Sequence, residues 1–576
     1  MLGVRRLAAA RSIAARAVLA AGPSTQTASS LLQTVATPRQ KSTSVVNATS
    51  ARTSPRWAPA RGLTFEDHHY DGMPVTPSTV AEGLQLENAE RCPFLSEVKH
   101  TIEQDLIQDQ SANVASADPE VATNGMRSII AGCLQNVLNR LKAEERYREF
   151  RYLKRSVGSH PEVLWQMPSA QGQGDSVVKT VVNWCSNDYL NMGHHPAVLQ
   201  AMQNTLAEQG AGAGGTRNIS GSNVLHVELE AELANLSGTE NALLFQSCYT
   251  ANLGVFEGLH ASLGDKTMIF SDQENHASLV QGIRNTRLPK RIFRHNDVGH
   301  LEELLRAAPD DHHKVVVFET VYSMSGTRAP LADLMALCKE HGAMTVVDEV
   351  HAVGLYGPHG AGVLEEEGFL GQADIVTGTL GKAFGTTGGY VAANHDIIDV
   401  IRSTAPSFIF TTSMSPVMAA GALASVQTVR SDSRDRRQML ATANWLKSRM
   451  LEEGIPLMSA ETHIMPVLVG DGNTCKAMAD HLLEQGIYVQ PINFPSVPKG
   501  EELLRFTASP RHTDAHCNQL LSVLKDLCAK HGLLRAPRNA AATPQPTSDG
   551  AHACICVRRQ GDCTTDSCPA LMRATA

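Results

Sequence analysis

The first 65 residues of the chain contain no aspartate and no glutamate. Nine arginines and lysines are spread over the same stretch among serine, threonine and alanine, and Val4, Leu7, Ile13 and Val18 can share one face of a helix. This composition is typical of a mitochondrial targeting sequence, because such sequences are basic, amphipathic and poor in acids. It predicts a presequence over residues 1–60 and a protein of the mitochondrial matrix, with association with the inner membrane face left open.

Long apolar runs, a strong net charge and clustered cysteines are also missing. No apolar run approaches the ~18 residues that a membrane-spanning helix needs, so no membrane span is expected. The net charge of −8 gives no reason to expect a nucleic-acid partner. Eight of the 12 cysteines stand singly through the middle of the chain and the other four lie in the tail, which argues against a disulfide framework and favours a reducing compartment. Hydrophobic content of 42% with 19% charged residues is ordinary for a soluble globular enzyme.

A chain of 576 residues exceeds what one hydrophobic core usually supports. Composition and periodicity divide it into a presequence (1–60), a linker (61–125), an N-terminal segment (126–196), a large domain (197–420), a smaller αβ domain (421–534) and a disordered tail (535–576). The tail is rich in Ala, Pro and Thr, and the spacing of its four cysteines fits no zinc site.

Short β-branched runs alternate with helical periodicity through the large domain. Because these runs are apolar on both faces, they predict a mostly parallel sheet with helices on both sides, and hence an α/β fold. The expected strands are 242–245, 268–270, 314–318, 344–347, 375–379 and 389–392, with helices at 223–236 and 330–341. A helix lies within 125–156, a strand at 180–184, and a long helical stretch from Pro416 to about 453 precedes the smaller unit with strands at 463–469, 487–491 and 503–507.

One lysine and one aspartate indicate the chemistry. Lys382 stands in a glycine-flanked turn just after the apolar segment 374–378, and the preceding strand ends in Asp348. A pyridoxal phosphate (PLP) enzyme needs such a lysine to hold the cofactor as a Schiff base, and such an aspartate to keep the pyridine nitrogen protonated. A surface lysine and an ordinary strand-end aspartate would explain either residue alone, but not both in this order.

Other polar residues also follow predicted strands, at the sheet edge where ligands of such folds bind. Residues 319–323 follow one strand, residues 246–249 follow another and open a helix whose N–H groups suit a phosphate, and His276 stands where a flat ring could stack. A lone histidine is more often a hydrogen-bonded core or surface residue. The glycine-rich run 210–215 follows a helix, so it is no dinucleotide fingerprint; a loop lining a tight substrate channel fits better.

Five longer segments resemble the 5-aminolevulinate synthases: 183–190, 210–221, 347–357, 378–385 and 408–413. The resemblance covers about residues 126–533. It implies a fold-type I PLP-dependent transferase, with a large domain whose mostly parallel sheet is covered by helices on both faces and a smaller αβ C-terminal domain. It further implies a homodimer with a shared active site that condenses glycine with succinyl-CoA to 5-aminolevulinate, CoA and CO2, the first step of haem biosynthesis.

The resemblance also implies roles for individual residues. Lys382 would bind the cofactor and remove a glycine proton, Asp348 would pair with the pyridinium nitrogen, His351 would lie beside the ring's phenolic oxygen, and His276 would stack on the ring. The remaining cofactor contacts implied are Cys248, Tyr249, Ser323 and Thr379, with Thr411 and Thr412 reaching the phosphate from the partner subunit.

The substrate contacts follow from the same resemblance. Asn187 and Arg505 would hold the glycine carboxylate, and Arg148 the succinyl carboxylate, for which a guanidinium offers a bidentate fork. The further substrate contacts implied are Thr216, Asn218, Ile219, Ser271, Lys290 and Ser496. Two positions depart from the family pattern: Ser496 stands where the family usually has Thr and keeps the hydroxyl, and Ser325 replaces a common acid.

The linker contains Arg91-Cys-Pro-Phe-Leu95, which resembles the haem regulatory motif of animal members of the family and makes Cys92 a candidate haem ligand. Cys568, also followed by proline, is a weaker second match. Two rival functions stay open. The first is another enzyme of the wider α-oxoamine synthase group, with a different acyl-CoA or amino acid; a neutral acyl chain would have no use for Arg148. The second is a catalytically inactive haem-sensing homologue, which would have no chemical reason to keep Lys382 and Asp348.

Overall fold

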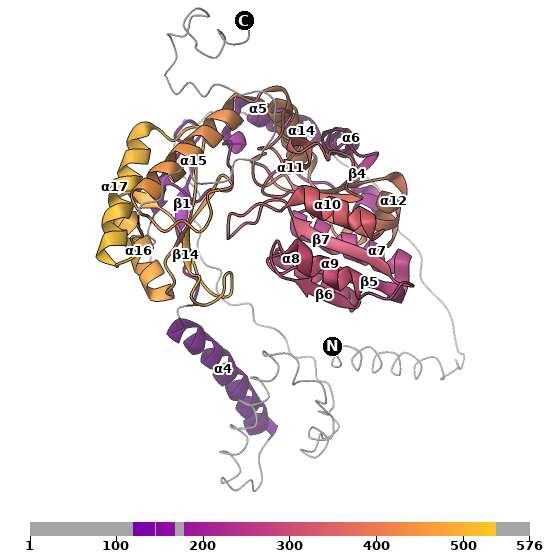
Figure 1. Cartoon of the computed structure of the whole chain (residues 1–576), viewed down its shortest axis with the longest axis horizontal. Coiled ribbons are helices and arrows are strands. Elements are labelled where there is room, and N and C mark those ends of the chain that lie inside the picture. Colours follow the sequence, from indigo (N-terminus) through magenta and orange to yellow (C-terminus); the bar gives the residue numbers. More distant parts are fainter. Residues whose placement is uncertain (1–118, 145, 167–177, 537–576) are drawn as a thin grey trace, which may run out of the picture. The chain divides into compact units, whose positions relative to one another are not determined.

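The structure is a computed structural model that describes residues 119–144, 146–166 and 178–536 (Figure 1). The predicted presequence, Cys92 in the linker, and the tail with Cys568 lie outside the described residues.

A seven-stranded sheet is the centre of the large domain. Its order is β4 (Asn241–Phe245), β10 (Gly389–Ala393), β9 (Ile375–Thr379), β8 (Met344–Asp348), β7 (His313–Glu319), β5 (Thr267–Asp272) and β6 (Lys290–Phe293). Only β10 runs antiparallel to its neighbours, β4 and β9. The mostly parallel sheet predicted from the sequence is therefore confirmed. Strand β6 was not predicted, because in Lys-Arg-Ile-Phe only Phe293 is buried and no apolar run marks it.

Helices cover both faces of this sheet. Alternate side chains of β7 enter two different apolar cores: Val316 and Phe318 join one, and Val315 and Val317 join the other. The covering helices are α5 (Pro196–Gln209), α6 (Val224–Ser237), α7 (Cys248–Leu263), α8 (Ala277–Thr286), α9 (Val298–Arg306), α10 (Leu331–Glu340), α11 (Val363–Glu366), α12 (His395–Thr404), α13 (Pro406–Ile409) and α14 (Pro416–Ser431). The helices predicted at 223–236 and 330–341 are α6 and α10.

The smaller domain has a core of its own. Strands β11 (Ile464–Leu468), β14 (Leu503–Thr507) and β13 (Pro491–Ile492) form an antiparallel sheet in that order, with α15 (Arg434–Glu452), α16 (Gly472–Glu484) and α17 (Asp514–Lys530) completing the domain. The long helical stretch predicted after Pro416 is in fact two helices. Helix α14 ends at Ser431 because the next residue, Asp432, is extended and its carboxylate accepts the backbone N–H of Arg434.

The N-terminal segment packs into this smaller domain. Strands β1 (Tyr152–Lys154), β2 (Glu162–Gln166) and β3 (Val178–Asn183) form a sheet that β12 (Ile487–Tyr488) extends by pairing parallel to β3. Val182 and Trp184 accordingly belong to the core of the smaller domain.

Helix α4 (Pro119–Ala143) precedes this sheet and confirms the predicted amphipathic helix. Its apolar side chains are solvent-exposed in the single chain: Ile129, Ile130, Leu134, Val137 and Leu138 are between 40% and 63% exposed. Over the described ranges, no helix combines the length and the apolar character needed to cross a bilayer.

Candidate active site

The polar residues predicted at strand ends meet at one edge of the large sheet. Parallel pairing puts Glu319, the last residue of β7, opposite Asp348, the last residue of β8, and Asp348 opposite Thr377 of β9. Because the carboxyl ends of parallel strands share an edge, Lys382, which follows β9, lies beside both acids. The strand-end placement expected from the sequence is confirmed.

Lys382 lies in a tight turn that packs against the short 3-10 helix Met192–His194. The N–H of Gly385 donates to the Lys382 carbonyl at 2.8 Å, and Gly385 has a φ of 65°. A Cβ at Gly385 would lie 2.1 Å from the backbone nitrogen of Gly193, so only glycine fits there. The turn therefore fixes where the Lys382 side chain begins.

The Lys382 amine is buried and hydrogen-bonded to a histidine. Its Nζ lies 2.5 Å from Nε2 of His351. Burial, together with repulsion from the Arg505 guanidinium, lowers the pKa of Lys382 to about 8 despite the nearby Asp348 carboxylate. A large share of this amine is therefore neutral near pH 8, and a neutral amine is the form that attacks a carbonyl or takes a proton.

His351 connects the amine to an arginine of the smaller domain. Its Nδ1 lies 2.8 Å from the Tyr189 hydroxyl, and that hydroxyl accepts from Nη2 of Arg505 at 2.9 Å. Since Tyr189 then donates to Nδ1, the proton of the neutral imidazole stands on Nε2 and faces Lys382. Burial, with Lys382 and Arg505 nearby, lowers the pKa of His351 well below its ordinary value and so favours this neutral form.

Asp348 is buried and held in one orientation. Its Oδ2 accepts from the Asn252 amide of α7 at 3.0 Å, and its Oδ1 accepts from the Val350 N–H at 2.8 Å. Together the two hydrogen bonds fix the direction in which the carboxylate points. The Asn252 amide also donates to Ser278 at 2.9 Å, which ties α7 to α8. Asn252 and Tyr189 were not assigned roles from the sequence, because neither stands in a pattern that marks a distant partner.

His276 is the N-cap of α8. Its Nδ1 lies 2.7 Å from the Ser278 hydroxyl, and its backbone N–H donates to Glu319 at 2.6 Å. Burial lowers the pKa of His276, with Asp348 opposing this effect and Lys382 adding to it. Burial and the adjacent Asp348 raise the pKa of Glu319 well above its ordinary value. The imidazole is thus neutral and anchored beside the edge that Lys382 and Asp348 share.

Arg505 and Asn187, both predicted to hold the glycine carboxylate, lie in hydrogen-bond contact. Arg505 comes from β14 of the smaller domain and is 6% exposed. Its Nη1 donates to Asn187 at 3.1 Å and its Nε donates to the carbonyl of Ser323 at 2.7 Å. A buried guanidinium surrounded by neutral acceptors keeps its charge available for a carboxylate.

Further hydrogen bonds hold the N-terminus of α7 and the end of β9. Ser247 caps α7 by accepting from the Thr250 N–H at 3.2 Å, and Cys248 and Tyr249 are the first two helical residues. The Thr379 hydroxyl donates to the Gly388 carbonyl at 3.1 Å and accepts from the Gly381 N–H at 3.2 Å. Thr411 and Thr412 lie next to Gln246, whose side-chain amide donates to the Thr412 carbonyl.

Several residues predicted to bind substrate lie apart from these contacts. Arg148 is exposed and has no hydrogen bond or ion pair with any described residue, and Ser496 is also exposed. Lys290 opens the edge strand β6, whereas Ser271 is only 1% exposed and its hydroxyl accepts from Asn275 at 2.9 Å. Thr216, Asn218 and Ile219 lie at a short π-helix, Arg217–Gly221, where Ile219 is 81% exposed. Their contacts with substrate stay predictions.

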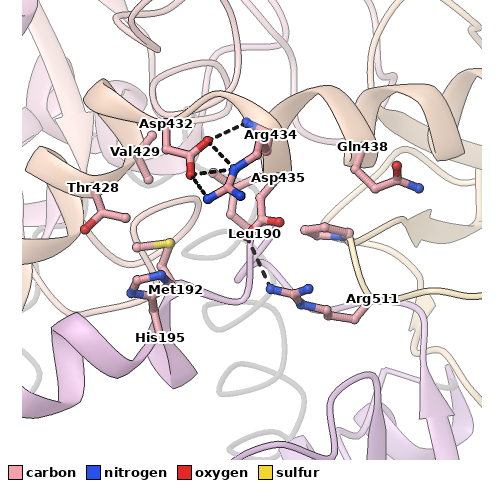
Figure 2. A pocket seen from close by; sticks show the side chains of 11 residues that line it. Leu190, Met192, His195, Thr428, Val429, Asp432, Arg434, Asp435, Gln438 and Arg511 are labelled. Carbon is pink, nitrogen blue, oxygen red and sulfur yellow. Dashed lines mark hydrogen bonds and ion pairs between the residues drawn. The ribbon is translucent and has the colours of Figure 1, made fainter. Parts of the chain in front are cut away.

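Two cavities lie outside the Lys382 contacts. One, of about 370 Å³, is lined by Leu190, Met192, helix residues on both sides of the α14–α15 junction, and Arg511, which points toward Asp435 (Figure 2). Its two arginines are already paired, Arg434 with Asp432 and Arg511 with Asp435. The second, of about 300 Å³, is lined by Arg146, Phe494 and Lys499, close in sequence to Arg148 and Ser496.

The residues at the sheet edge fit PLP. The amine of Lys382 is partly neutral, Asp348 is a fixed carboxylate that suits a protonated ring nitrogen, and His276 offers a flat neutral ring. The start of α7, with its positive helix end, suits a phosphate group. Nothing in this set resembles a metal site, since among the described residues no three His, Cys, Asp or Glu side chains are grouped to hold a metal ion.

Comparisons with known proteins agree with this chemistry. Residues 179–524 match the family described as aminotransferase class I and II. The chain is 45% identical over 408 residues to the 5-aminolevulinate synthase of Bradyrhizobium diazoefficiens, with 71% of this chain and 98% of that protein covered. It is also 45% identical over 405 residues to the non-specific, mitochondrial 5-aminolevulinate synthase of Gallus gallus, with 69% and 62% covered.

Among solved structures, the chain is similar to serine palmitoyltransferase from S. paucimobilis. A form of that enzyme with a bound PLP–myriocin aldimine matches at 31% identity and a TM-score of 0.62, over 66% of this chain and 94% of the other. A 30% identical structure of SPT with its PLP internal aldimine has a TM-score of 0.64 and covers 71% and 99%.

Proposed function

The chain belongs to the 5-aminolevulinate synthases, PLP-dependent acyltransferases of the aminotransferase class I and II family, and from this premise we propose which of its residues carry the reaction. Lys382 holds the cofactor and then serves as the base that removes a proton from glycine. Asp348 holds the ring nitrogen, His351 the phenolic oxygen, and His276 the ring face. When bound, PLP supplies an electron-withdrawing ring that stabilises negative charge on the glycine α-carbon.

This proposal rests mainly on a chain of hydrogen bonds that runs from Lys382 through His351 and Tyr189 to Arg505. It joins the base to the proposed glycine-binding arginine by 2.5, 2.8 and 2.9 Å hydrogen bonds. Arg505 and Asn187 would bind the glycine carboxylate, which places the α-carbon near the Lys382 amine. With a pKa of about 8, that amine can accept a proton at mildly alkaline pH, whereas an unperturbed lysine with a pKa of 10.5 would be charged.

We propose that the phosphate of the cofactor lies at the start of α7. There the backbone of Cys248 and Tyr249 and the hydroxyl of Thr379 would hold it, with Thr411 and Thr412 contributed by a second subunit. Exposed apolar side chains support such a homodimer: Ile219, Tyr249 and Phe410 are 81%, 44% and 81% exposed in the single chain. A single subunit would leave them, and the apolar face of α4, in water.

We propose that Arg148 binds the carboxylate of succinyl-CoA, with Ser496, Thr216, Asn218 and Ile219 nearby and Ser271 and Lys290 toward the CoA portion. Arg148 supports this because its guanidinium has no partner among the described side chains. Residues two positions from Arg148 and from Ser496 line one 300 Å³ cavity, which supports their proximity. Condensation would then release CoA and CO2 and leave 5-aminolevulinate.

The acid-free N-terminus and the mitochondrial relatives support a mitochondrial matrix location. We further propose that haem, the end product of the pathway, binds Cys92 as a feedback regulator. Addition of haem should then inhibit import or activity of the full chain but not of a Cys92→Ser variant.

The succinyl assignment is tested by replacing Arg148 with leucine. The KM for succinyl-CoA should rise by about 10- to 100-fold, since a hydrogen-bonded charge pair is lost, while the KM for glycine stays near that of the unaltered enzyme. Arg148→Lys should recover part of the loss, because lysine keeps the charge and loses the fork. Glu149→Gln, at the exposed neighbour, is the matched control. Equal turnover with acetyl-CoA would favour a different acyl donor.

A further inference from the structure

The loop Tyr322–Arg328, which connects β7 to α10, reaches the proposed substrate-binding arginine. The carbonyl of Ser323 in this loop accepts from Nε of Arg505 at 2.7 Å. The loop is closed on itself, since the Gly326 N–H donates to the Tyr322 carbonyl at 3.1 Å and the Tyr322 N–H donates to the Thr327 carbonyl at 3.0 Å. Because the loop is compact, its position sets the position of the Ser323 carbonyl.

His295, in the connection between β6 and α9, holds this loop against the sheet. Its Nε2 lies 2.8 Å from the Thr327 hydroxyl, and its Nδ1 lies 3.0 Å from Asp272 at the end of β5. Its ring packs perpendicular to the ring of Tyr322, with ring centroids 4.3 Å apart. Asp272 is itself 2% exposed and accepts the N–H groups of Glu274 and Asn296 at 2.8 and 2.9 Å. The imidazole is therefore fixed to the sheet through Nδ1, and its Nε2 faces the loop.

The smaller domain holds the opposite side of the same loop. Glu461 accepts the Arg328 N–H at 2.9 Å, and the Thr462 hydroxyl donates to the Gly326 carbonyl at 2.9 Å. The loop thus lies between the two domains, with the sheet on one side through His295 and the domain that carries Arg505 on the other.

We propose that His295, anchored by Asp272, is a positioning residue for Arg505: by holding Thr327 it places the Ser323 carbonyl that orients the guanidinium toward the substrate carboxylate. This inference rests on the proposed role of Arg505 in binding glycine. Neither His295 nor Thr327 touches the reacting groups, so both act through the loop and through Arg505.

The hydrogen bond between His295 and Thr327 can form in either charge state of His295, because a hydroxyl can both donate and accept. Burial tends to lower the pKa of His295, but the hydrogen bond to Asp272 and the charges of Asp272, Glu274 and Glu461 raise it. The imidazolium donates to Thr327, whose hydroxyl can donate onward to Ser325 at 2.8 Å. In the neutral ring, with its proton on Nδ1 facing Asp272, Thr327 donates to Nε2 and Ser325 donates to Thr327.

Thr327→Val is the direct test, because valine keeps the shape and loses the hydroxyl. The KM for glycine should rise by about 2- to 10-fold, as for one lost hydrogen bond, while the KM for succinyl-CoA stays unchanged. Thr327→Ser, which restores the hydroxyl, should return the glycine KM to that of the unaltered enzyme, and His295→Leu should match Thr327→Val. An unchanged glycine KM in Thr327→Val, or equal changes in both KM values, overturns the proposal.

Amide hydrogen exchange of residues 322–328 in the holoenzyme tests the same contact without reference to turnover. Exchange should be faster in Thr327→Val than in the unaltered enzyme, and Thr327→Ser should leave it slow. Unchanged exchange in Thr327→Val shows that His295 does not hold the loop, and the proposal fails while the proposed function stands. If the unaltered enzyme instead releases no CoA in the presence of glycine, the proposed function fails, and the exchange result still decides whether the loop is held.

Discussion

Nζ of Lys382 lies 2.5 Å from Nε2 of His351, and both groups are buried. Each of these two groups is pushed toward its neutral form, because burial penalises charge and Arg505 adds repulsion to both. When the amine is neutral, it can accept a hydrogen bond from the Nε2–H of the neutral imidazole. This contact supports the two roles that we propose for Lys382, as the anchor of the cofactor and then as a base.

The rate at which the cofactor-free enzyme attaches PLP should depend on this pKa. The rate should rise with pH and level off above a midpoint near 8, because only the neutral amine attacks and the pKa of Lys382 is lowered to about 8. The growth of the bound-cofactor absorbance band, followed by stopped flow between pH 6 and 10, measures it. A rate that still climbs steeply at pH 10 would mean that the amine is unperturbed.

Asp348→Asn should bind PLP but turn over at least about 100-fold more slowly, since it keeps the shape and loses the charge that stabilises the ring nitrogen. Steady-state kcat, with bound PLP counted by absorbance, gives the comparison. Asn252→Ala, which removes only the amide that orients Asp348, should lose about 10-fold. Equal activity of Asp348→Asn and the unaltered enzyme would exclude Asp348 from the reaction.

Arg505→Lys should weaken glycine binding specifically. Lysine cannot make the three hydrogen bonds that the guanidinium makes to Asn187, Tyr189 and Ser323, so the KM for glycine should rise by about 10- to 100-fold. The KM for succinyl-CoA should not follow it. Arg511→Lys, at a more exposed arginine paired with Asp435, is the control and should have normal kinetics. If both variants behave alike, Arg505 does not bind the substrate.

Gly385→Ala should destabilise the turn that carries Lys382. The residue has a φ of 65° and its Cβ would lie 2.1 Å from the Gly193 nitrogen, so we expect a loss of about 1–3 kcal/mol in the free energy of unfolding. Gly381→Ala is the matched control, because its Cβ would find no atom nearer than 3.6 Å. Chemical denaturation of the cofactor-free enzyme separates the two. Equal stability of both variants would contradict the close packing.

The sequence was sufficient to predict the buried strands of the large sheet and the residues at their ends. Buried parallel strands are apolar on both faces, so β5, β7, β8 and β9 appear as short β-branched runs, and Asp348 and Lys382 follow such runs directly. Edge strand β6 lacks this signal because three of its four residues are exposed. The resemblance to a known family supplied roles that the local pattern alone could not.

Contacts between distant residues could not be predicted from the sequence. Tyr189 meets a histidine 162 residues away and an arginine 316 residues away, and no local spacing encodes such pairs. The same holds for His295 and Thr327, which are 32 residues apart and belong to connections between strands and helices. The pairing of β3 with β12, which builds the N-terminal segment into the smaller domain, is likewise a property of the folded chain.

Release of CoA from succinyl-CoA by the purified, PLP-loaded enzyme, with and without glycine, tests the central claim most directly. The unaltered enzyme should release CoA only when glycine is present and should form 5-aminolevulinate in equal amount. Lys382→Ala should release none under the same conditions, although the protein remains folded. Glycine-dependent release by Lys382→Ala at the rate of the unaltered enzyme would contradict the account, because Lys382 would then be neither anchor nor base.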